Sequence, residues 1–224
     1  MRKFLLGILL CALCVIFTGC NTSTLDLVLE NMAEVRYNVF SGEDDVVSLT
    51  FMSGKRENPY VVNGVCEKTV DFGLLTVKFK NDDLPTSANY RINTDDLEYS
   101  GALEFNNYEN TFLVDIQKIV SDDTNITVAV IVGSDIYEVT LISQTKAFEI
   151  TWYTALQIAV EEMKEDLQNY VKNNTLDGEV YVKVIVDINN QFSNYYWYVC
   201  IVNSDGDTNA VIIDPTSGEV IAKK

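Results

Sequence analysis

Hydrophobic and polar residues alternate with a period of two along much of residues 33–144. The pattern is clearest over six short segments: 35–39, 47–51, 75–79, 112–116, 126–132 and 137–141. Such a period places one set of side chains on a buried face and the other set in solvent. Turn-forming residues such as Ser41–Asp45 and Gly133–Asp135 separate the segments. Seven or eight short strands of this kind predict an antiparallel β-sandwich over residues 31–146.

The predicted sandwich resembles an immunoglobulin-like or fibronectin-type domain in its pattern alone, because no diagnostic motif accompanies it. Residues 53–68 interrupt the alternation and bring Lys55, Arg56 and Tyr60 into an otherwise acidic region. Long loops in compact domains are often functional. These three residues are therefore candidates for a loop contact, and the alternative is a plain connecting loop or an edge strand.

The period changes to that of a helix after Thr151. The apolar positions that recur at helical spacing are Leu156, Ala159, Val160, Met163, Leu167, Tyr170 and Val171. Thr154 and Gln157 fit a capping box at the start, and Asn173-Asn174 and Asp177-Gly178 are stop signals. We expect one amphipathic helix whose apolar stripe belongs to a core.

Three strands follow the predicted helix. Alternating valines mark the first strand from Val180, the segment Tyr195–Val202 is nearly all apolar, and Ala210–Ile213 forms the third. Ser204-Asp205-Gly206-Asp207 is a hairpin signal between the last two. The fold class is thus mainly β, with a sandwich followed by a small α+β domain over residues 150–224, in which one helix packs on a three-stranded antiparallel sheet.

This C-terminal third is similar to a PepSY domain. The resemblance rests on the helix at Ala155–Ala159, the strand at Tyr196–Val199 and the ending Val211–Ile221, in which an apolar strand, Asp214, a turn with Gly218 and a short strand succeed one another. The family has no catalytic residues to carry over. Its occurrence in bacterial secreted and membrane proteins, and its proposed link to peptidase inhibition, imply a binding or regulatory module.

The N-terminus has the layout of a secretory signal. Arg2 and Lys3 precede an apolar run over residues 4–18, which is shorter than the roughly 20 residues needed to span a bilayer. The sequence Phe17-Thr18-Gly19-Cys20 resembles the bacterial lipobox. That resemblance implies a signal peptide over residues 1–19, lipid attachment at Cys20 and a lipidated tether over residues 20–30. We therefore expect an extracytoplasmic protein that a lipid anchors to the bacterial cell membrane.

Composition excludes several other functions. The formal net charge is −17, and loss of residues 1–19 with their two basic and no acidic residues changes it to −19. Nucleic-acid binding requires a basic face, so no nucleic-acid partner is expected. The chain contains no histidine, which removes His-based triads and His-ligated zinc sites. No cofactor and no metal site are expected, because the oxygen-rich segment Asn203–Asn209 and the paired aspartates, such as Asp122-Asp123, fit turns.

Two cysteines, Cys66 and Cys200, remain after the signal and the lipidated residue are set aside. They lie far apart in sequence and in different predicted domains. We expect two free, buried thiols, although an extracytoplasmic compartment would permit a disulfide between them.

The densest aromatic run supplies the candidate binding face. Tyr196 and Tyr198 must point to one side of their strand, and Tyr195 and Trp197 to the other. Because one helix covers only one face of the sheet, we expect Trp197 or Tyr198, whichever points away from the helix, to lie at a contact. The candidate binding residues are Tyr181, Tyr195, Trp197 and Tyr198. Alanine at the contact residue should weaken the contact by about 1–3 kcal/mol.

These observations predict a non-catalytic, membrane-anchored module that binds or regulates a protein or peptide, with a peptidase as one class of partner. Two alternatives stay open. The first is a carboxylate-dependent hydrolase that acts on envelope polymers, which would need two carboxylates about 5–10 Å apart across a cleft. The second is a structural spacer at the cell surface.

Overall fold

The computed structural model describes residues 23–59, 61, 63–81, 83–95, 98–186 and 195–224. This part of the chain is mainly β, and its strand pairs are antiparallel apart from one parallel pair. The strands of the first part are β1 (Met32–Glu43), β2 (Val47–Glu57), β3 (Thr69–Phe79), β4 (Asn89–Asn93), β5 (Glu98–Ala102), β6 (Glu104–Asn106), β7 (Thr111–Asp115), β8 (Ile126–Val132) and β9 (Asp135–Ser143). The later strands are β10 (Val171–Lys172), β11 (Thr175–Leu176), β12 (Glu179–Val186), β13 (Tyr195–Val202), β14 (Thr208–Ile213) and β15 (Val220–Lys223).

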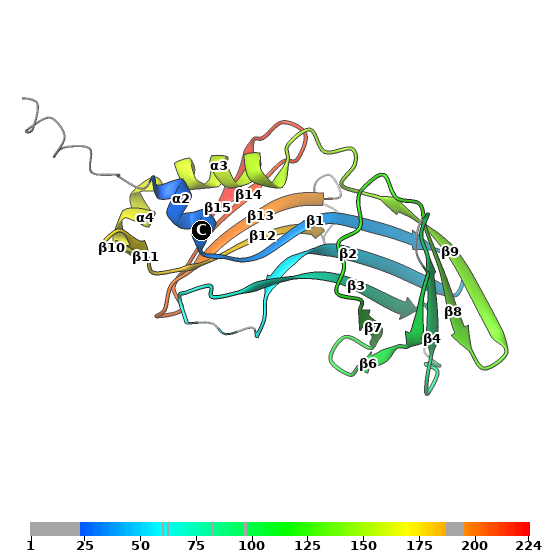
Figure 1. The fold of residues 1–224 in the computed structure, drawn as a ribbon. Coiled ribbons are helices and arrows are strands. Elements are labelled where there is room, and N and C mark those ends of the chain that lie inside the picture. The colour runs from blue at the N-terminus through cyan, green and yellow to red at the C-terminus, as the bar shows by residue number, and fades with distance from the viewer. Residues whose placement is uncertain (1–22, 60, 62, 82, 96–97, 187–194) are drawn as a thin grey trace, which may run out of the picture.

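Strand β1 joins the two parts of the molecule. Its first half pairs with β12 in parallel, from Met32 to Val35, and Phe40 and Ser41 in its second half pair with β9. Along its other side β1 pairs with β2, which continues to β3. The order β15-β14-β13-β12-β1-β2-β3-β7-β6 therefore forms one continuous path across the boundary that the sequence predicts near residues 147–149 (Figure 1).

The first part is a nearly closed, barrel-like sheet, and the predicted immunoglobulin-like sandwich is not confirmed. In a sandwich two sheets face each other without a ladder between them, whereas here β9 hydrogen-bonds to β1. Gly42 permits this approach, because a Cβ at its position would lie 2.6 Å from the backbone oxygen of Thr140. The expected alternation is confirmed inside this sheet, where Val47, Leu49 and Phe51 are fully buried.

Helices cover one face of the C-terminal sheet: α2 (Thr24–Glu30), α3 (Trp152–Glu162) and α4 (Lys164–Tyr170) (Figure 1). The predicted apolar stripe is confirmed, since Leu156, Ala159, Met163 and Leu167 are fully buried. The predicted capping box at Thr154 is wrong. Thr151 is the N-cap, and its hydroxyl accepts a hydrogen bond from the Thr154 amide.

The predicted single helix is in fact two helices, because α3 ends and α4 begins at Met163. The three-stranded sheet of the prediction carries further strands on both sides, because β15 pairs with β14 and β1 pairs with β12. The hairpin at residues 204–207 is confirmed, with Gly206 at φ 86° between β13 and β14.

The sequence predicts a tether over residues 20–30, but residues 24–30 are folded. They form α2, which has a complete capping box between Ser23 and Asp26 and buries Leu27 and Val28 in the helix-side core. Cys20 and the rest of the predicted signal and tether lie outside the described residues. Among the residues that the structure describes, no helix combines the length and the apolar character needed to cross a bilayer.

Candidate functional site

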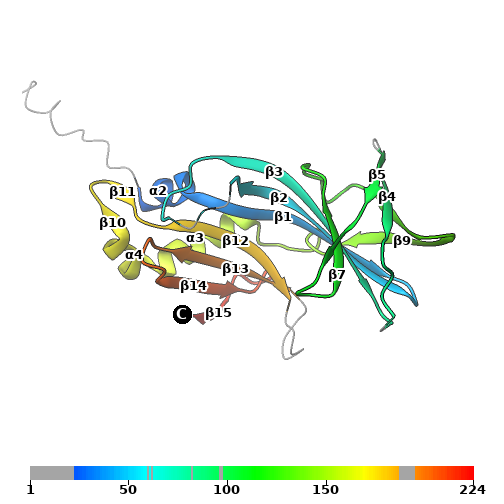
Figure 2. The ribbon, with the colours of Figure 1, turned by 90° about the horizontal axis from the view of Figure 1, so that it is seen from below.

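The four residues of the predicted binding face lie on two different faces of the C-terminal sheet. Trp197 is 2% exposed in the core beneath α3, and Tyr195 packs at the margin of that core. Tyr181 and Tyr198 lie on the opposite face, which Figure 2 views from the side away from the helices. The strand alternation expected for Trp197 and Tyr198 is therefore present, and Tyr198 is the residue that points away from the helix.

A segment of the β2–β3 connection lies against this opposite face. The buried carboxylate of Glu179 accepts hydrogen bonds from the amides of Asn63 and Gly64 at 2.6 and 2.9 Å, and from the Tyr181 hydroxyl at 2.6 Å. Cys66 packs against the apolar cluster that includes Cys200. The two thiols, predicted to be in separate domains, thus border one cluster, and both are free.

The Cys66 thiol and the Tyr198 phenol of this face resist ionisation. Burial, reinforced by the charges of Glu57 and Glu179, raises the pKa of Cys66 to about 11. Burial, together with the neighbouring Cys200 thiol, raises the pKa of Tyr198 to about 12. Neutral thiols are poor nucleophiles, so this face offers packing surface instead of reactive groups.

An ion-pair ladder crosses the same face. Glu34 accepts from Arg36 Nε at 2.6 Å and pairs with Lys183 Nζ at 2.7 Å, while Lys183 Nζ lies 4.8 Å from the centroid of the Tyr181 ring. Burial alone would raise the pKa of Glu34, but its contacts with Arg36 and Lys183 outweigh burial and lower it. The ladder ties β12 to β1 at the point where the two parts of the molecule meet.

Replacement of Glu34 with glutamine should therefore change the pH dependence of stability. A lowered pKa in the folded state stabilises the protein above about pH 4.3, the ordinary value for glutamate, and this contribution is lost as pH falls through the folded-state pKa. We expect Glu34→Gln to reduce the free energy of unfolding by about 1–3 kcal/mol at pH 7, and the difference from wild type to shrink below pH 4. Urea titrations at both pH values measure this. Glu43→Gln, which breaks the exposed pair with Lys80, should change stability by less than about 1 kcal/mol; an equal loss in both variants would contradict the role of Glu34.

The candidate loop residues are separated as well. Lys55 and Arg56 belong to β2, which extends to Glu57 as a central strand, so they lie neither in a loop nor in an edge strand. Lys55 is exposed on the helix side and lies 3.9 Å from Asp71. Arg56 pairs with Asp115 and stacks over the Phe72 ring at 5.1 Å. Tyr60 lies outside the described residues.

A pocket of about 410 Å³ opens between the start of α3, β1 and the β7–β8 connection. We call it the aromatic pocket. Its apolar lining consists of Tyr37, Phe148, Ile150, Trp152 and Trp197. Tyr37 meets Trp152 edge-on with ring centroids 5.6 Å apart, and Phe148 meets Trp197 in the same manner at 5.5 Å. The Trp197 indole nitrogen donates a hydrogen bond to the Ile150 carbonyl at 2.7 Å, which fixes the orientation of the Trp197 ring. Both tryptophans of the chain therefore line this one pocket.

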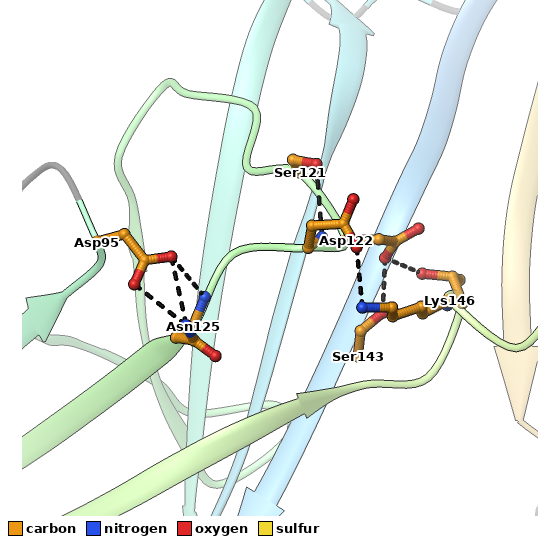
Figure 3. Close-up of polar contacts among 8 residues, drawn as sticks. Asp95, Ser121, Asp122, Asn125, Ser143 and Lys146 are labelled. Carbon is orange, nitrogen blue, oxygen red and sulfur yellow. Dashed lines mark hydrogen bonds and ion pairs between the residues drawn. The ribbon is translucent and has the colours of Figure 1, made fainter.

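The other wall of the pocket is polar, and Figure 3 shows the contacts that Asp122 and Lys146 make there. Asp122 Oδ1 accepts hydrogen bonds from Ser143 Oγ and Thr145 Oγ1, both at 2.6 Å. Asp123 pairs with Lys146 at 2.8 Å, and the hydrogen bond and charge of Lys146 lower the pKa of Asp123. Both carboxylates come from one loop, and neither faces the other across the cleft.

Asp122 and Asp123 belong to the connection between β7 and β8, which we call the Asp122 loop. Hydrogen bonds hold this loop in place on both sides of the two carboxylates. The Val120 amide donates to Ser53 Oγ at 3.1 Å, and the Asn38 side chain donates to the Val120 carbonyl. Beyond the pocket, the Asn125 amide donates to Asp95 at 3.2 Å (Figure 3). The wall is therefore positioned before any ligand arrives, which lowers the entropic cost of binding.

A second pocket, of about 280 Å³, adjoins the first, because Tyr37 and Trp152 line both. The remaining residues of its lining are Leu29, Glu30, Met32, Val35, Lys55, Cys66, Glu67 and Thr69. We call the two pockets together the aromatic groove. It runs from α2 past the Tyr37–Trp152 pair to the Asp122 loop. Concave apolar surfaces with a few fixed polar groups are typical of binding sites.

Most of this groove was not predicted from the sequence. The alternation over residues 35–39 predicts a strand with Tyr37 on its buried face, Asp122-Asp123 fits a turn, and the predicted site residues include neither Phe148 nor Trp152. The available signal was the apolar residues Phe148 and Ile150 in the connection before α3, because connecting segments are usually polar, together with Trp152 at the first position of the helix.

Another pocket, of about 450 Å³ and mostly polar, lies between α4 and the β13–β14 hairpin. It brings Asp166 and Asp207 together, but Lys223 pairs with Asp166 at 3.1 Å. Within the described part of the chain, no group of three or more metal-ligating side chains occurs.

Comparison with protein-family models, curated proteins and solved structures gave no significant match. The resemblances to the lipobox and to the PepSY domain therefore remain predictions.

Proposed function

We propose that the chain is a lipid-anchored extracytoplasmic protein that binds a protein or peptide segment in the aromatic groove, without catalysing a reaction. The observation that carries this proposal is the groove itself, in which Tyr37 and Trp152 connect two pockets on the helix side of the sheet. Aromatic rings bury a large area at low entropic cost, and they are frequent anchors of protein interfaces.

The anchor would place the groove close to the membrane. With lipid on Cys20, only residues 20–23 separate the lipid from α2, and four residues span at most about 14 Å. Leu29 and Glu30 of α2 line one end of the groove. A partner bound there would be a membrane-proximal segment, such as part of another envelope protein.

We also propose that the C-terminal unit is PepSY-like. A helix packed on an antiparallel sheet supports this assignment, as does the closing turn, in which Asp214 Oδ1 accepts from the amides of Thr216 and Ser217 at 2.9 and 2.8 Å. The parallel pairing of β1 with β12 and the additional helix α2 extend this unit beyond the pattern that suggested it.

A hydrolase is not proposed. The carboxylates of the aromatic pocket lie on one loop, and the lowered pKa of Asp123 keeps it ionised and unsuited to protonating a leaving group. Asp166 and Asp207 share the polar pocket, but the ion pair with Lys223 occupies Asp166.

Selection of peptides tests the proposal. Phage-displayed random dodecapeptides would be panned against residues 20–224 carrying Cys20→Ser, with no lipid attached. We expect enriched peptides whose affinity falls at least tenfold on Trp152→Ala, which corresponds to the loss of one interface anchor. Trp152 is the first residue of α3 and only half-buried, so the variant should fold.

Tyr108→Ala is the matched control, because Tyr108 is fully exposed on the remote β6–β7 turn. Circular dichroism verifies the fold of both variants. Enriched peptides that bind wild type and Trp152→Ala equally, or the absence of any enrichment, would contradict binding in the groove.

A further inference from the structure

The lining of the aromatic groove is acidic as well as aromatic. Its charged residues are Glu30, Glu67, Asp122, Asp123, Lys55 and Lys146, which are four carboxylates against two amines. Lys146 is already paired with Asp123, and Lys55 lies close to Asp71, another carboxylate. The groove therefore presents a negative potential, and the whole chain, with a net charge of −17, strengthens it.

Asp122 has hydrogen-bonding capacity to spare. Both of its hydrogen bonds, from Ser143 and Thr145, end on Oδ1, and among the described residues none reaches Oδ2. Thr145 is itself fixed, since its hydroxyl accepts from the Val39 amide at 3.1 Å. A carboxylate oriented in this way can accept a charge-assisted hydrogen bond from a cation without first rearranging.

The aromatic wall of the pocket, opposite Asp122, also suits a cation. An ammonium or guanidinium group is attracted to the face of an aromatic ring, most strongly to that of tryptophan. Trp152 and Tyr37 are only half-buried, so parts of their rings remain accessible, and the pocket volume of about 410 Å³ accommodates a long, unbranched side chain. Aliphatic carbons would pack on the rings while the charged end reaches the Asp122 loop.

We propose that the aromatic pocket binds a lysine or arginine side chain of the partner, with Asp122 as the acceptor and Trp152 and Tyr37 as the packing surface. This inference rests on the proposed function and specifies its ligand as a basic segment of a peptide or protein. Lys146 has the opposite role: it neutralises Asp123 and so reduces the attraction of the pocket for cations.

Hexapeptide mixtures with one fixed central residue test the proposal. Lysine, arginine, norleucine and glutamate would be compared at that position, and binding would be followed by the fluorescence of the two tryptophans, both of which line the pocket. We expect the lysine and arginine mixtures to bind at least about tenfold more tightly than the norleucine mixture, and the glutamate mixture to bind most weakly. Higher salt should reduce the difference in affinity between the lysine and norleucine mixtures.

Two variants give opposite expected results. Asp122→Asn keeps an oxygen for Ser143 and Thr145 but removes the charge, so the preference for lysine over norleucine should fall at least fivefold. Lys146→Met leaves Asp123 unpaired, so the lysine mixture should bind more tightly, which damage to the fold would not produce. Asp135→Asn removes an exposed charge at the start of β9, outside the lining of the groove, and should change neither.

Equal binding of the lysine and norleucine mixtures, or an unchanged preference in Asp122→Asn, would overturn the assignment of a basic ligand. If the mixtures bind without preference and Trp152→Ala abolishes that binding, the proposed function stands and this inference alone fails. If no mixture binds, both fail.

Discussion

Replacement of Trp197 with alanine is expected to lower the free energy of unfolding by about 3–5 kcal/mol, the usual cost of removing a large buried aromatic side chain. Trp197 is 2% exposed, packs edge-on against Phe148 and donates its indole hydrogen to the Ile150 carbonyl. The substitution would leave a cavity and a carbonyl without its donor. A domain is stable by only about 5–15 kcal/mol, so a large shift of the urea midpoint follows.

Two further variants test how much of this loss comes from the Trp197 ring and whether it is specific to the helix-side face of the strand. Trp197→Phe keeps an aromatic ring and should cost about 1–3 kcal/mol. Tyr198→Ala, on the opposite and less buried face, should cost less than Trp197→Ala. Urea unfolding followed by far-ultraviolet circular dichroism measures all three. A Trp197→Ala midpoint close to that of wild type would show that this ring is not part of the core.

Replacement of Gly54 with alanine is expected to cost about 3 kcal/mol or more, because the added methyl group has no space. A Cβ at this position would lie 1.9 Å from the Val35 carbonyl oxygen and 3.0 Å from the Arg36 Cα, and both neighbours are backbone. The pairing of β1 with β2 shifts register just beyond, between Arg36 and Asn38. Relief of the overlap would have to separate the two strands, beyond what side-chain repacking can provide.

Both parts of the molecule should respond to Gly54→Ala, since β1 and β2 contribute to each core. We expect circular dichroism and tryptophan fluorescence to lose their signals in one shared transition at a lower urea concentration. Gly101→Ala is the control, because its nearest neighbour is a side-chain atom of Tyr90 at 3.3 Å, and it should cost less than about 1 kcal/mol. A Gly54→Ala variant as stable as this control would contradict the strand geometry.

Local patterns predicted the elements well. Alternation placed Val47, Leu49 and Phe51 inside, and helical spacing identified the buried face of Leu156, Ala159 and Met163. Both signals arise within a few residues of chain, where side-chain direction follows directly from backbone geometry. The hairpin at Gly206 was accessible for the same reason, since a turn depends on its own residues.

Relations between distant segments were not accessible in this way. The parallel pairing of Met32–Val35 with β12 joins segments almost 150 residues apart and leaves no mark in either segment. Because of this pairing, the two predicted domains share one continuous sheet. Cys66, predicted in the first domain, packs against the cluster that contains Cys200. The helix α2 was missed because its polar start suited the tether expected after a lipobox.

The groove depends on the same long-range pairing. Tyr37, Trp152, Trp197 and Asp122 meet there from β1, α3, β13 and the β7–β8 connection, and the sequence could suggest only that Trp197 was important. It left open whether Trp197 or Tyr198 points away from the helix, because which side of an apolar strand a helix will cover depends on the packing of the helix and not on the strand.

Nuclear magnetic resonance of the two indole groups tests the central claim most directly. The chain, labelled with ¹⁵N-tryptophan, would be titrated with one lysine-centred peptide, and the same solutions would be measured by calorimetry. Binding in the aromatic groove predicts that the Trp152 and Trp197 indole signals both shift, with a dissociation constant equal to the calorimetric value. Heat of binding with both indole signals unmoved would place the peptide elsewhere on the protein and contradict the account.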